Sequence, residues 1–143
     1  MSALPVVVPD ASVLLKWVLP DTDEDDVGAA LALRGAIIEE RVGALLPTLW
    51  LFEAANTLGR RYPDDAPTLV RGLMSLGIPK RRPSGSWLEV GLDLVRRFEV
   101  TFYDASYHAT ALTAGGALVT ADERYAKRAS GAGAVMLLRD WRQ

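Results

Sequence analysis

The chain has no cysteine and only one histidine, His108, among its 143 residues. Without cysteine, disulfide bonds, thiolate nucleophiles and zinc sites with cysteine ligands are excluded. The single histidine likewise excludes any catalytic apparatus that needs two. The lack of cysteine is compatible with the reducing cytoplasm, where we expect the protein to act.

Long hydrophobic runs and an excess of basic residues are also missing. No apolar stretch reaches the roughly 20 residues needed to cross a membrane, and residues 1–5 carry no basic leader, so we expect neither a membrane span nor a signal peptide. The net charge of −2 argues against a protein that coats nucleic acid by charge alone. With 50% hydrophobic and 24% charged residues, the chain suits a globular protein, and its length predicts one domain over residues 1–143.

Short apolar runs alternate with helical patterns along the chain. We predict strands over residues 6–9, 44–46, 100–103, 117–120 and 135–138. We predict helices over residues 12–19, 23–41, 48–61, 65–76, 87–98, 104–113 and 122–130, and a polar loop over 80–85. This alternation indicates an α/β fold with a short, mainly parallel central sheet flanked by helices.

The most informative pattern is a set of acidic residues at or near the ends of widely separated apolar runs. They are Asp10, Glu53, Asp104 and Asp122. Such residues can converge, because ligands of open α/β folds bind at the edge where parallel strands end. Converging carboxylates repel one another unless a cation lies among them. The pattern therefore predicts a divalent-metal site, which in turn indicates hydrolytic or phosphoryl-transfer chemistry.

Three of the four acids also have a simpler explanation as helix caps. Asp10 and Asp104 each precede or begin a predicted helix and could cap it. The stretch from Thr120 to Glu123 fits a capping box, with Thr120 as the cap. Taken singly, capping is the better explanation for each of these acids.

The position of Glu53 favours a shared acidic site over helix capping. On a helix it would lie on the same face as Trp50 and Ala54, in a largely apolar segment. A buried acid is costly unless it is paired or bound to a metal. Asn56, three residues further on, is placed to hold its carboxylate.

Basic residues gather in two parts of the chain. Arg124, Lys127 and Arg128 are spaced i, i+3, i+4, which would place them on one helix face, and six more basic residues lie within 60–82. The segment 21–26 is by contrast strongly acidic. Solvated surface explains each basic cluster alone. In the functional interpretation, the two basic clusters lie beside the acidic site and hold a phosphate backbone, RNA in particular, next to it.

Four short stretches match motifs of one known family in order and spacing. They are Val8-Pro9-Asp10-Ala11-Ser12-Val13, Leu49-Trp50-Leu51-Phe52-Glu53-Ala54-Ala55-Asn56, Tyr103-Asp104-Ala105-Ser106-Tyr107 and Thr120-Ala121-Asp122-Glu123-Arg124-Tyr125. Through them the chain resembles the PIN-domain ribonucleases, and within these the VapC-type toxins of bacterial and archaeal toxin–antitoxin pairs. The resemblance covers nearly the whole chain and implies a PIN-like fold.

The resemblance also implies an activity and partners. It implies a Mg²⁺- or Mn²⁺-dependent endoribonuclease that forms a homodimer and is silenced by a cognate antitoxin. It assigns the acidic quartet to Asp10, Glu53, Asp104 and Asp122, and supporting roles to Ser12, Asn56 and Thr120. For His108 we expect a surface or packing role, although its position four residues after Asp104 would let it reach the site.

The chemistry of RNA hydrolysis suggests how the acids divide the work. The attacking water must become nucleophilic, and the negative charge that develops on the leaving oxygen must be neutralised. Two metal ions about 3.5–4 Å apart can serve both needs. We expect Asp10 to be the central ligand, with Asp104 and Asp122 completing the metal shells. Glu53 would hold or help to activate the attacking water.

Other functions remain open at this stage. One is a PIN nuclease that processes RNA outside a toxin system. Another is a receiver-like, phosphate-accepting regulatory domain, but that fold expects an acidic pair where Asp10 is followed by Ala11 and a lysine where the chain has Arg139 and Asp140. A haloacid-dehalogenase-like phosphatase would need a second aspartate at the position of Ser12.

Overall fold

The computed structural model describes residues 4–19 and 26–142. The acidic segment 21–26, except for Asp26, and the first part of the predicted helix 23–41 lie outside the described residues. Within the described ranges, no helix is both long and apolar enough to pass through a membrane.

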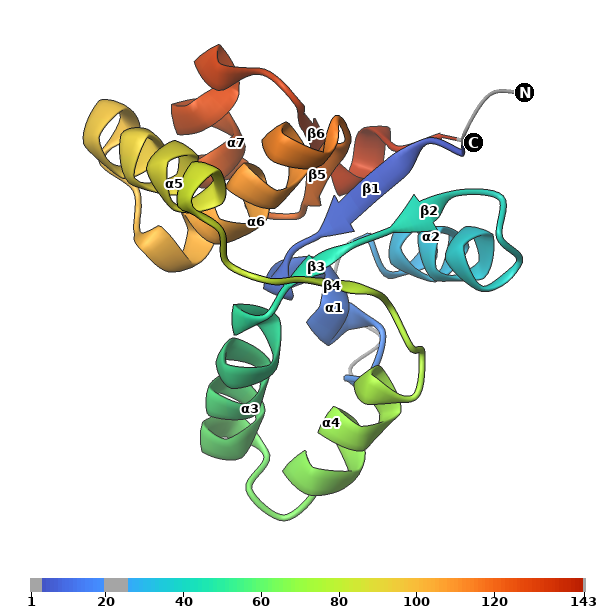
Figure 1. Cartoon of the computed structure of the whole chain (residues 1–143). Helices are drawn as coiled ribbons and strands as arrows, with labels where there is room; N and C mark the ends of the chain where they lie inside the picture. Colours follow the sequence, from blue (N-terminus) through green and yellow to red (C-terminus); the bar gives the residue numbers. More distant parts are fainter. Residues whose placement is uncertain (1–3, 20–25, 143) are drawn as a thin grey trace.

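A four-stranded parallel sheet forms the centre of the molecule (Figure 1). Its strands are β1 (Val6–Pro9), β2 (Gly43–Ala44), β5 (Ala117–Thr120) and β6 (Val135–Leu137), in the order β2-β1-β5-β6. In the register of the central pair, Val8 lies opposite Leu118. The predicted strands 6–9 and 117–120 are confirmed with the same bounds, and the last strand ends one residue earlier than predicted.

A second, two-stranded parallel sheet joins β3 (Leu46–Pro47) to β4 (Lys80–Arg81). The predicted strand 44–46 is therefore divided between two sheets. The predicted polar loop 80–85 is wrong at its start, because Lys80 and Arg81 pair with β3. The Leu46 N–H donates to the Pro79 carbonyl at 3.0 Å, so main-chain groups rather than side chains determine this pairing.

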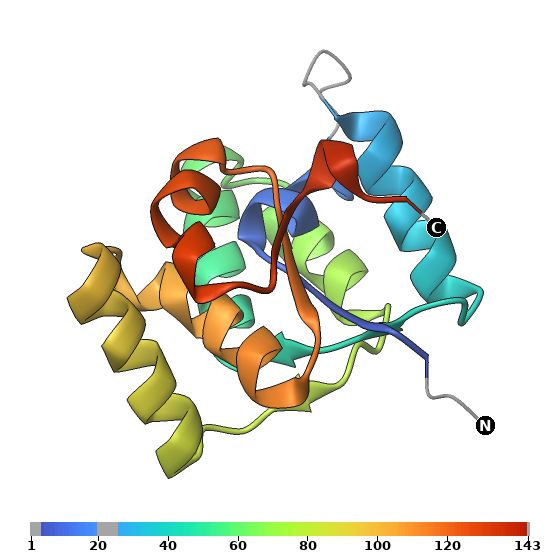
Figure 2. The ribbon, with the colours of Figure 1, turned by 90° about the horizontal axis from the view of Figure 1, so that it is seen from above.

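Seven α-helices surround the sheet in the described residues. They are α1 (Ala11–Lys16), α2 (Val27–Ile38), α3 (Leu49–Arg61), α4 (Ala66–Met74), α5 (Gly85–Phe98), α6 (Phe102–Ala114) and α7 (Glu123–Ala129), with short 3₁₀ turns η1 (Ser130–Ala132) and η2 (Leu138–Asp140). Helix α6 packs against β1 and β5, and α5 lies alongside α6 (Figures 1 and 2). Helices α3 and α4 contact each other and project from the sheet (Figure 1).

The predicted strand 100–103 is wrong, because α6 begins within it. Thr101 caps that helix, its hydroxyl accepting a hydrogen bond from the Asp104 N–H at 3.2 Å. Phe102 packs edge-on against Trp87 of α5, with ring centroids 5.5 Å apart. Gly91 makes room for this ring, since a Cβ atom there would lie 2.8 Å from Phe102 Cε2. Tertiary packing thus overrides the β propensity of this β-branched and aromatic run.

The core lies where β1 and β5 meet. Val8, Val119 and Leu118 are buried there, as expected for parallel strands covered by helices. The two strands approach closely at their start, where a Cβ on Gly116 would lie 2.6 Å from the Val6 carbonyl oxygen. The predicted α/β fold with a mainly parallel sheet flanked by helices is confirmed.

Candidate metal centre

Asp10 lies at the end of the central strand β1. Its N–H donates to the Val119 carbonyl at 3.2 Å, which continues the pairing of β1 with β5. Its side chain does not cap α1, so the capping explanation fails here. The Ser12 hydroxyl instead donates to Asp10 Oδ1 at 2.5 Å and accepts a hydrogen bond from the Ala121 N–H at 2.9 Å. Ser12 therefore holds the carboxylate of Asp10 against the end of β5.

Asp122 follows β5 at the same edge of the sheet and caps α7. Its carboxylate accepts a hydrogen bond from the Tyr125 N–H at 3.1 Å. The predicted capping box, with Thr120 as the cap, is wrong, because the residue that caps α7 is Asp122, two positions later. Thr120 is buried, and its hydroxyl accepts a hydrogen bond from the Asp122 N–H at 3.0 Å. Thr120 thus fixes the main chain from which Asp122 projects.

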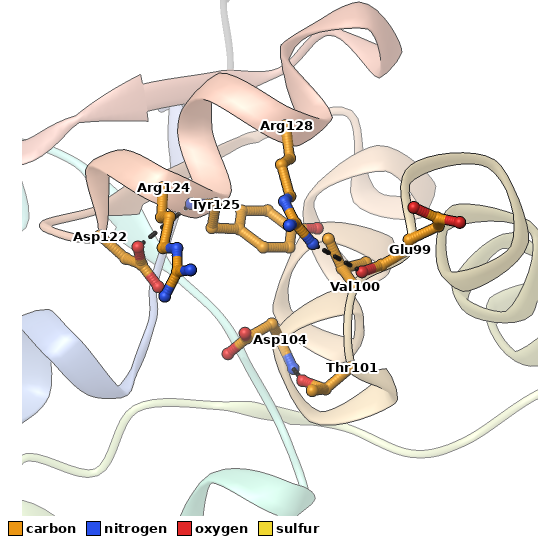
Figure 3. A pocket seen from close by; sticks show the side chains of 8 residues that line it. All are labelled: Glu99, Val100, Thr101, Asp104, Asp122, Arg124, Tyr125 and Arg128. Carbon is orange, nitrogen blue, oxygen red and sulfur yellow. Dashed lines mark hydrogen bonds between the residues drawn. The ribbon is translucent and has the colours of Figure 1, made fainter.

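Asp104 comes from the first turn of α6 rather than from a strand end. Because Thr101 caps this helix, the carboxylate of Asp104 is not used as a cap. Figure 3 shows the carboxylates of Asp104 and Asp122 directed into one cavity, with the Arg124 side chain beside Asp122. The cavity has a volume of about 290 Å³.

Glu53 is half-buried in α3, and its Oε2 atom is buried without a hydrogen-bond partner in the described part of the chain. Burial raises the pKa of Glu53, and the nearby Tyr107 of α6 offsets only part of that rise. Among the described residues the Tyr107 hydroxyl, like Glu53 Oε2, has no hydrogen-bond partner of normal geometry. Asn56 is exposed, and no hydrogen bond links it to Glu53 in the described ranges. Sequence reasoning missed Tyr107, which has no signal beyond its position three residues after Asp104.

The electrostatics show that the four acids share one environment. Burial raises the pKa of Asp10 to about 6, with a further rise from Asp104. Burial raises the pKa of Glu53 to about 7, with contributions from Asp104 and Asp10. The pKa of Asp104 is raised by burial and then by Asp122. The structure therefore brings together carboxylates from the residue after β1, from α3 and α6, and from the residue before α7.

This arrangement of donors fits a hard divalent cation. The ion pairs among the described residues lie elsewhere, for example between Asp93 and Arg96 and between Glu123 and Arg139. The quartet therefore has carboxylates that repel one another and a buried oxygen that lacks a donor. In residues 4–19 and 26–142, no three acidic or histidine side chains alone enclose a metal position. Mg²⁺ keeps several water ligands and requires only one or two carboxylates, so such an ion suits the site.

The three predicted RNA-binding residues do not share one cavity. Arg124 and Arg128 line the cavity of Asp104 and Asp122, whereas Lys127 lines a different cavity beside β6. The i, i+3, i+4 spacing on α7 is present, and RNA binding by all three residues stays a prediction. Arg128 also donates to the Glu99 carbonyl at 3.0 Å (Figure 3), which leaves Arg124 as the cation nearest the acids in this view.

His108 has a packing role, as expected from the sequence. It is fully buried. Its Nε2 donates to the Gly133 carbonyl at 2.8 Å, so the neutral ring presents Nδ1 to accept from the Tyr125 hydroxyl, also at 2.8 Å. Burial lowers the pKa of His108, which favours this neutral form. The ring thus joins the helix that carries Asp104 to the helix that follows Asp122.

Replacing His108 with alanine should destabilise the fold by about 2–4 kcal/mol, because it leaves a cavity and removes the partners of Tyr125 and Gly133. Urea unfolding would measure this. Tyr125→Phe is the matched control, since it removes one of the two hydrogen bonds and should cost only about 1 kcal/mol. Equal losses in the two variants would contradict the bridging role.

The sequence matches the PIN domain family over residues 7–131. The chain belongs to the PIN domain family. The match runs from β1 to η1 and includes all four acidic residues. Membership of this family argues against the receiver-like and phosphatase alternatives, and the predicted PIN-like fold is confirmed. None of the curated proteins compared with the chain matches it.

Solved structures share this PIN fold at low sequence identity. VapC20 from Mycobacterium tuberculosis, described as a Sarcin-Ricin loop cleaving toxin, is 19% identical with a TM-score of 0.66, over 90% of this chain and 96% of that one. DNA-bound VapBC from Salmonella typhimurium is 14% identical with a TM-score of 0.67, over 95% and 99% of the two chains. PAE2754 from Pyrobaculum aerophilum is 21% identical with a TM-score of 0.66, over 94% and 90%. At such identities the likeness concerns the fold.

Proposed function

We propose that this PIN domain is a divalent-metal-dependent endoribonuclease of the cytoplasm. The observation that carries the proposal is the convergence of Asp10, Glu53, Asp104 and Asp122 without a balancing ion pair in the described residues. Membership of the PIN family supports it, as does a structural neighbour described as cleaving the Sarcin-Ricin loop.

The four acids would take different parts in hydrolysis. Asp10, Asp104 and Asp122 would hold Mg²⁺ or Mn²⁺, which supplies charge neutralisation and Lewis acidity at the phosphate. Glu53, with a pKa raised to about 7, is suited to accept the proton of the attacking water, because a general base works best when its pKa lies near the working pH. Ser12 and Thr120 would keep the acids oriented through the hydrogen bonds described above.

A cleavage assay on total RNA tests this function. We expect cuts in the presence of Mg²⁺ and none with a chelator, with the cut ends mapped by sequencing. Mn²⁺ should restore activity to the chelated protein, because it also prefers oxygen ligands. RNA that stays intact under every metal condition would contradict the proposal.

We further propose that the protein is the toxin of a toxin–antitoxin pair and acts as a homodimer. Several structural neighbours are toxin–antitoxin complexes, including one from Klebsiella pneumoniae and VapBC2 from Rickettsia felis. Large apolar side chains are exposed on α3, α5 and α6, as an interface requires. They are Phe52, Leu88, Leu92 and Tyr103.

The antitoxin would dock along α4. Of the apolar residues in this region, Leu73 is buried, and Leu69 and Leu76 are partly buried against the core. Met74 is 51% exposed and remains available to a partner. An amphipathic antitoxin helix could pack its apolar face there beside the basic residues of 60–82.

Co-expression with a small protein encoded next to this chain distinguishes a toxin from an RNA-processing nuclease. For a toxin, we expect the two proteins to co-purify, growth arrest to be relieved and cleavage by the complex to be inhibited. Met74→Glu should weaken the complex, because it places a charge in the apolar contact. Growth arrest that persists with no complex would favour the RNA-processing alternative.

A further inference from the structure

Tyr107 is buried in α6, and its hydroxyl has no hydrogen-bond partner of normal geometry among the described residues. It follows Asp104 by three positions on the same helix, a spacing that places both side chains on one face. The other buried polar side chains of α6 do have partners; they are Ser106, His108 and Thr110. Because buried polar groups are normally paired, packing alone does not explain a tyrosine at this position.

The complementary unpaired atom is Oε2 of Glu53 on α3, which packs against α6. Burial raises the pKa of Tyr107, and the charges of Glu53 and Asp10 raise it further. The phenol therefore keeps its proton and can act as a donor. Among the described acids, only Glu53 lies within hydrogen-bonding reach of this hydroxyl. A donor and an acceptor are thus buried beside each other.

A small rotation of the Glu53 side chain joins the two atoms. The terminal torsion of a glutamate has a broad energy minimum, so the carboxylate can turn toward the hydroxyl at little cost. Each buried polar atom that stays unpaired is costly, and one hydrogen bond between these two removes both costs. Of the two carboxylate oxygens, only Oε2 is both buried and unpaired in the described part of the chain. Oε1 is therefore left to accept a proton.

We propose that Tyr107 is the positioning residue of Glu53, whose Oε2 accepts a hydrogen bond from the Tyr107 hydroxyl while Oε1 is directed toward the attacking water. The inference rests on the proposed ribonuclease function, in which Glu53 takes the proton of that water. Orientation matters because a general base must lie within hydrogen-bond reach of the proton that it accepts. Tyr107 keeps its own proton, so it forms no bond to the RNA and adds no step to the hydrolysis.

The kinetics of Tyr107→Phe test this role, because phenylalanine keeps the ring and removes only the hydroxyl. We expect kcat for the mapped RNA to fall about 10- to 100-fold, the range for a lost hydrogen bond to a charged group. KM should stay unchanged, because a buried residue that acts on the base contributes nothing to binding of the RNA. Tyr62→Phe is the matched control, since Tyr62 caps the C-terminal end of α3, away from Glu53, and it should cleave normally.

A double-mutant cycle separates positioning from packing. In a Glu53→Gln background, Tyr107→Phe should cause no further loss of kcat, because Tyr107 acts through Glu53. An equal loss of kcat in both backgrounds, or a change in KM alone, would show a packing role and overturn the proposal.

Proton NMR of the metal-free protein tests the hydrogen bond without any cleavage. The Tyr107 hydroxyl should give a slowly exchanging downfield signal that Tyr107→Phe removes. Glu53→Gln should move this signal upfield, because a hydrogen bond to a charged acceptor is shorter and stronger than one to a neutral amide. A signal that Glu53→Gln leaves in place, or no protected signal at all, would contradict the proposal. The expected signal in a protein that cuts no RNA would overturn the ribonuclease function and leave this hydrogen bond established.

Discussion

Asp10→Asn protein is expected to fold and to lose RNA cleavage by several orders of magnitude. Asparagine keeps the size of the side chain and its ability to accept the Ser12 hydrogen bond, but it removes the charge that would attract the cation. The same change should stabilise the metal-free protein. Burial raises the pKa of Asp10 from 3.8 to about 6, so its ionisation at neutral pH costs up to about 3 kcal/mol.

Both parts of this expectation can be checked on one preparation. Cleavage of the mapped RNA gives the activity, and urea unfolding at pH 7 gives the stability. Asp93→Asn is the control, because Asp93 is an exposed aspartate on α5 whose partners are Arg96 and Arg97. It should cleave normally and gain no stability. Full cleavage by folded Asp10→Asn protein would show that the quartet is not the active centre.

The metal-free protein is also expected to become less stable as the pH rises from about 4 to about 8. The folded protein binds protons at Asp10 and Glu53 more tightly than the unfolded chain, because their pKa values are raised from 3.8 and 4.5 to about 6 and about 7. The stability that these protons contribute is complete below the unfolded values and is lost as the pH passes the folded values.

Divalent metal should reverse this loss at the alkaline end. At pH 8, Mg²⁺ or Mn²⁺ at about 100 times its dissociation constant should add about 2.7 kcal/mol, or roughly 8 °C in Tm. At pH 5 the effect should be much smaller, because protons compete for the same carboxylates. Calorimetric scans at the two pH values, with and without metal, measure the difference. An Asp10→Asn/Glu53→Gln variant that still gained the same 8 °C would place the metal elsewhere.

The strands at the centre of the fold could be predicted because their side chains alone specify them. The runs 6–9 and 117–120 are short, apolar and bounded by turn residues, which is the pattern of a strand buried on both faces. Strand β4 has no such pattern. Its residues Lys80 and Arg81 are charged, and their pairing depends on main-chain groups of Leu46 and Pro47 that no local sequence encodes.

The candidate site shows the same division between local and tertiary information. The convergence of Asp10 and Asp122 follows from their place after paired parallel strands. Asp104 was expected for the wrong reason, since it comes from a helix whose start depends on Thr101. The contact of Tyr107 with Glu53 depends on how α3 and α6 lie against each other, and so it became visible only in the structure.

The order of pairing in the sheet has a consequence for the protein while it is being made. Strand β1 lies between β2 and β5, and Val8 meets Leu118. A growing chain emerges from its N-terminus, so Asp10 has no β5 beside it, and no Asp122, until the chain has been made past residue 122. The acidic site is therefore incomplete in every nascent chain that is shorter than this.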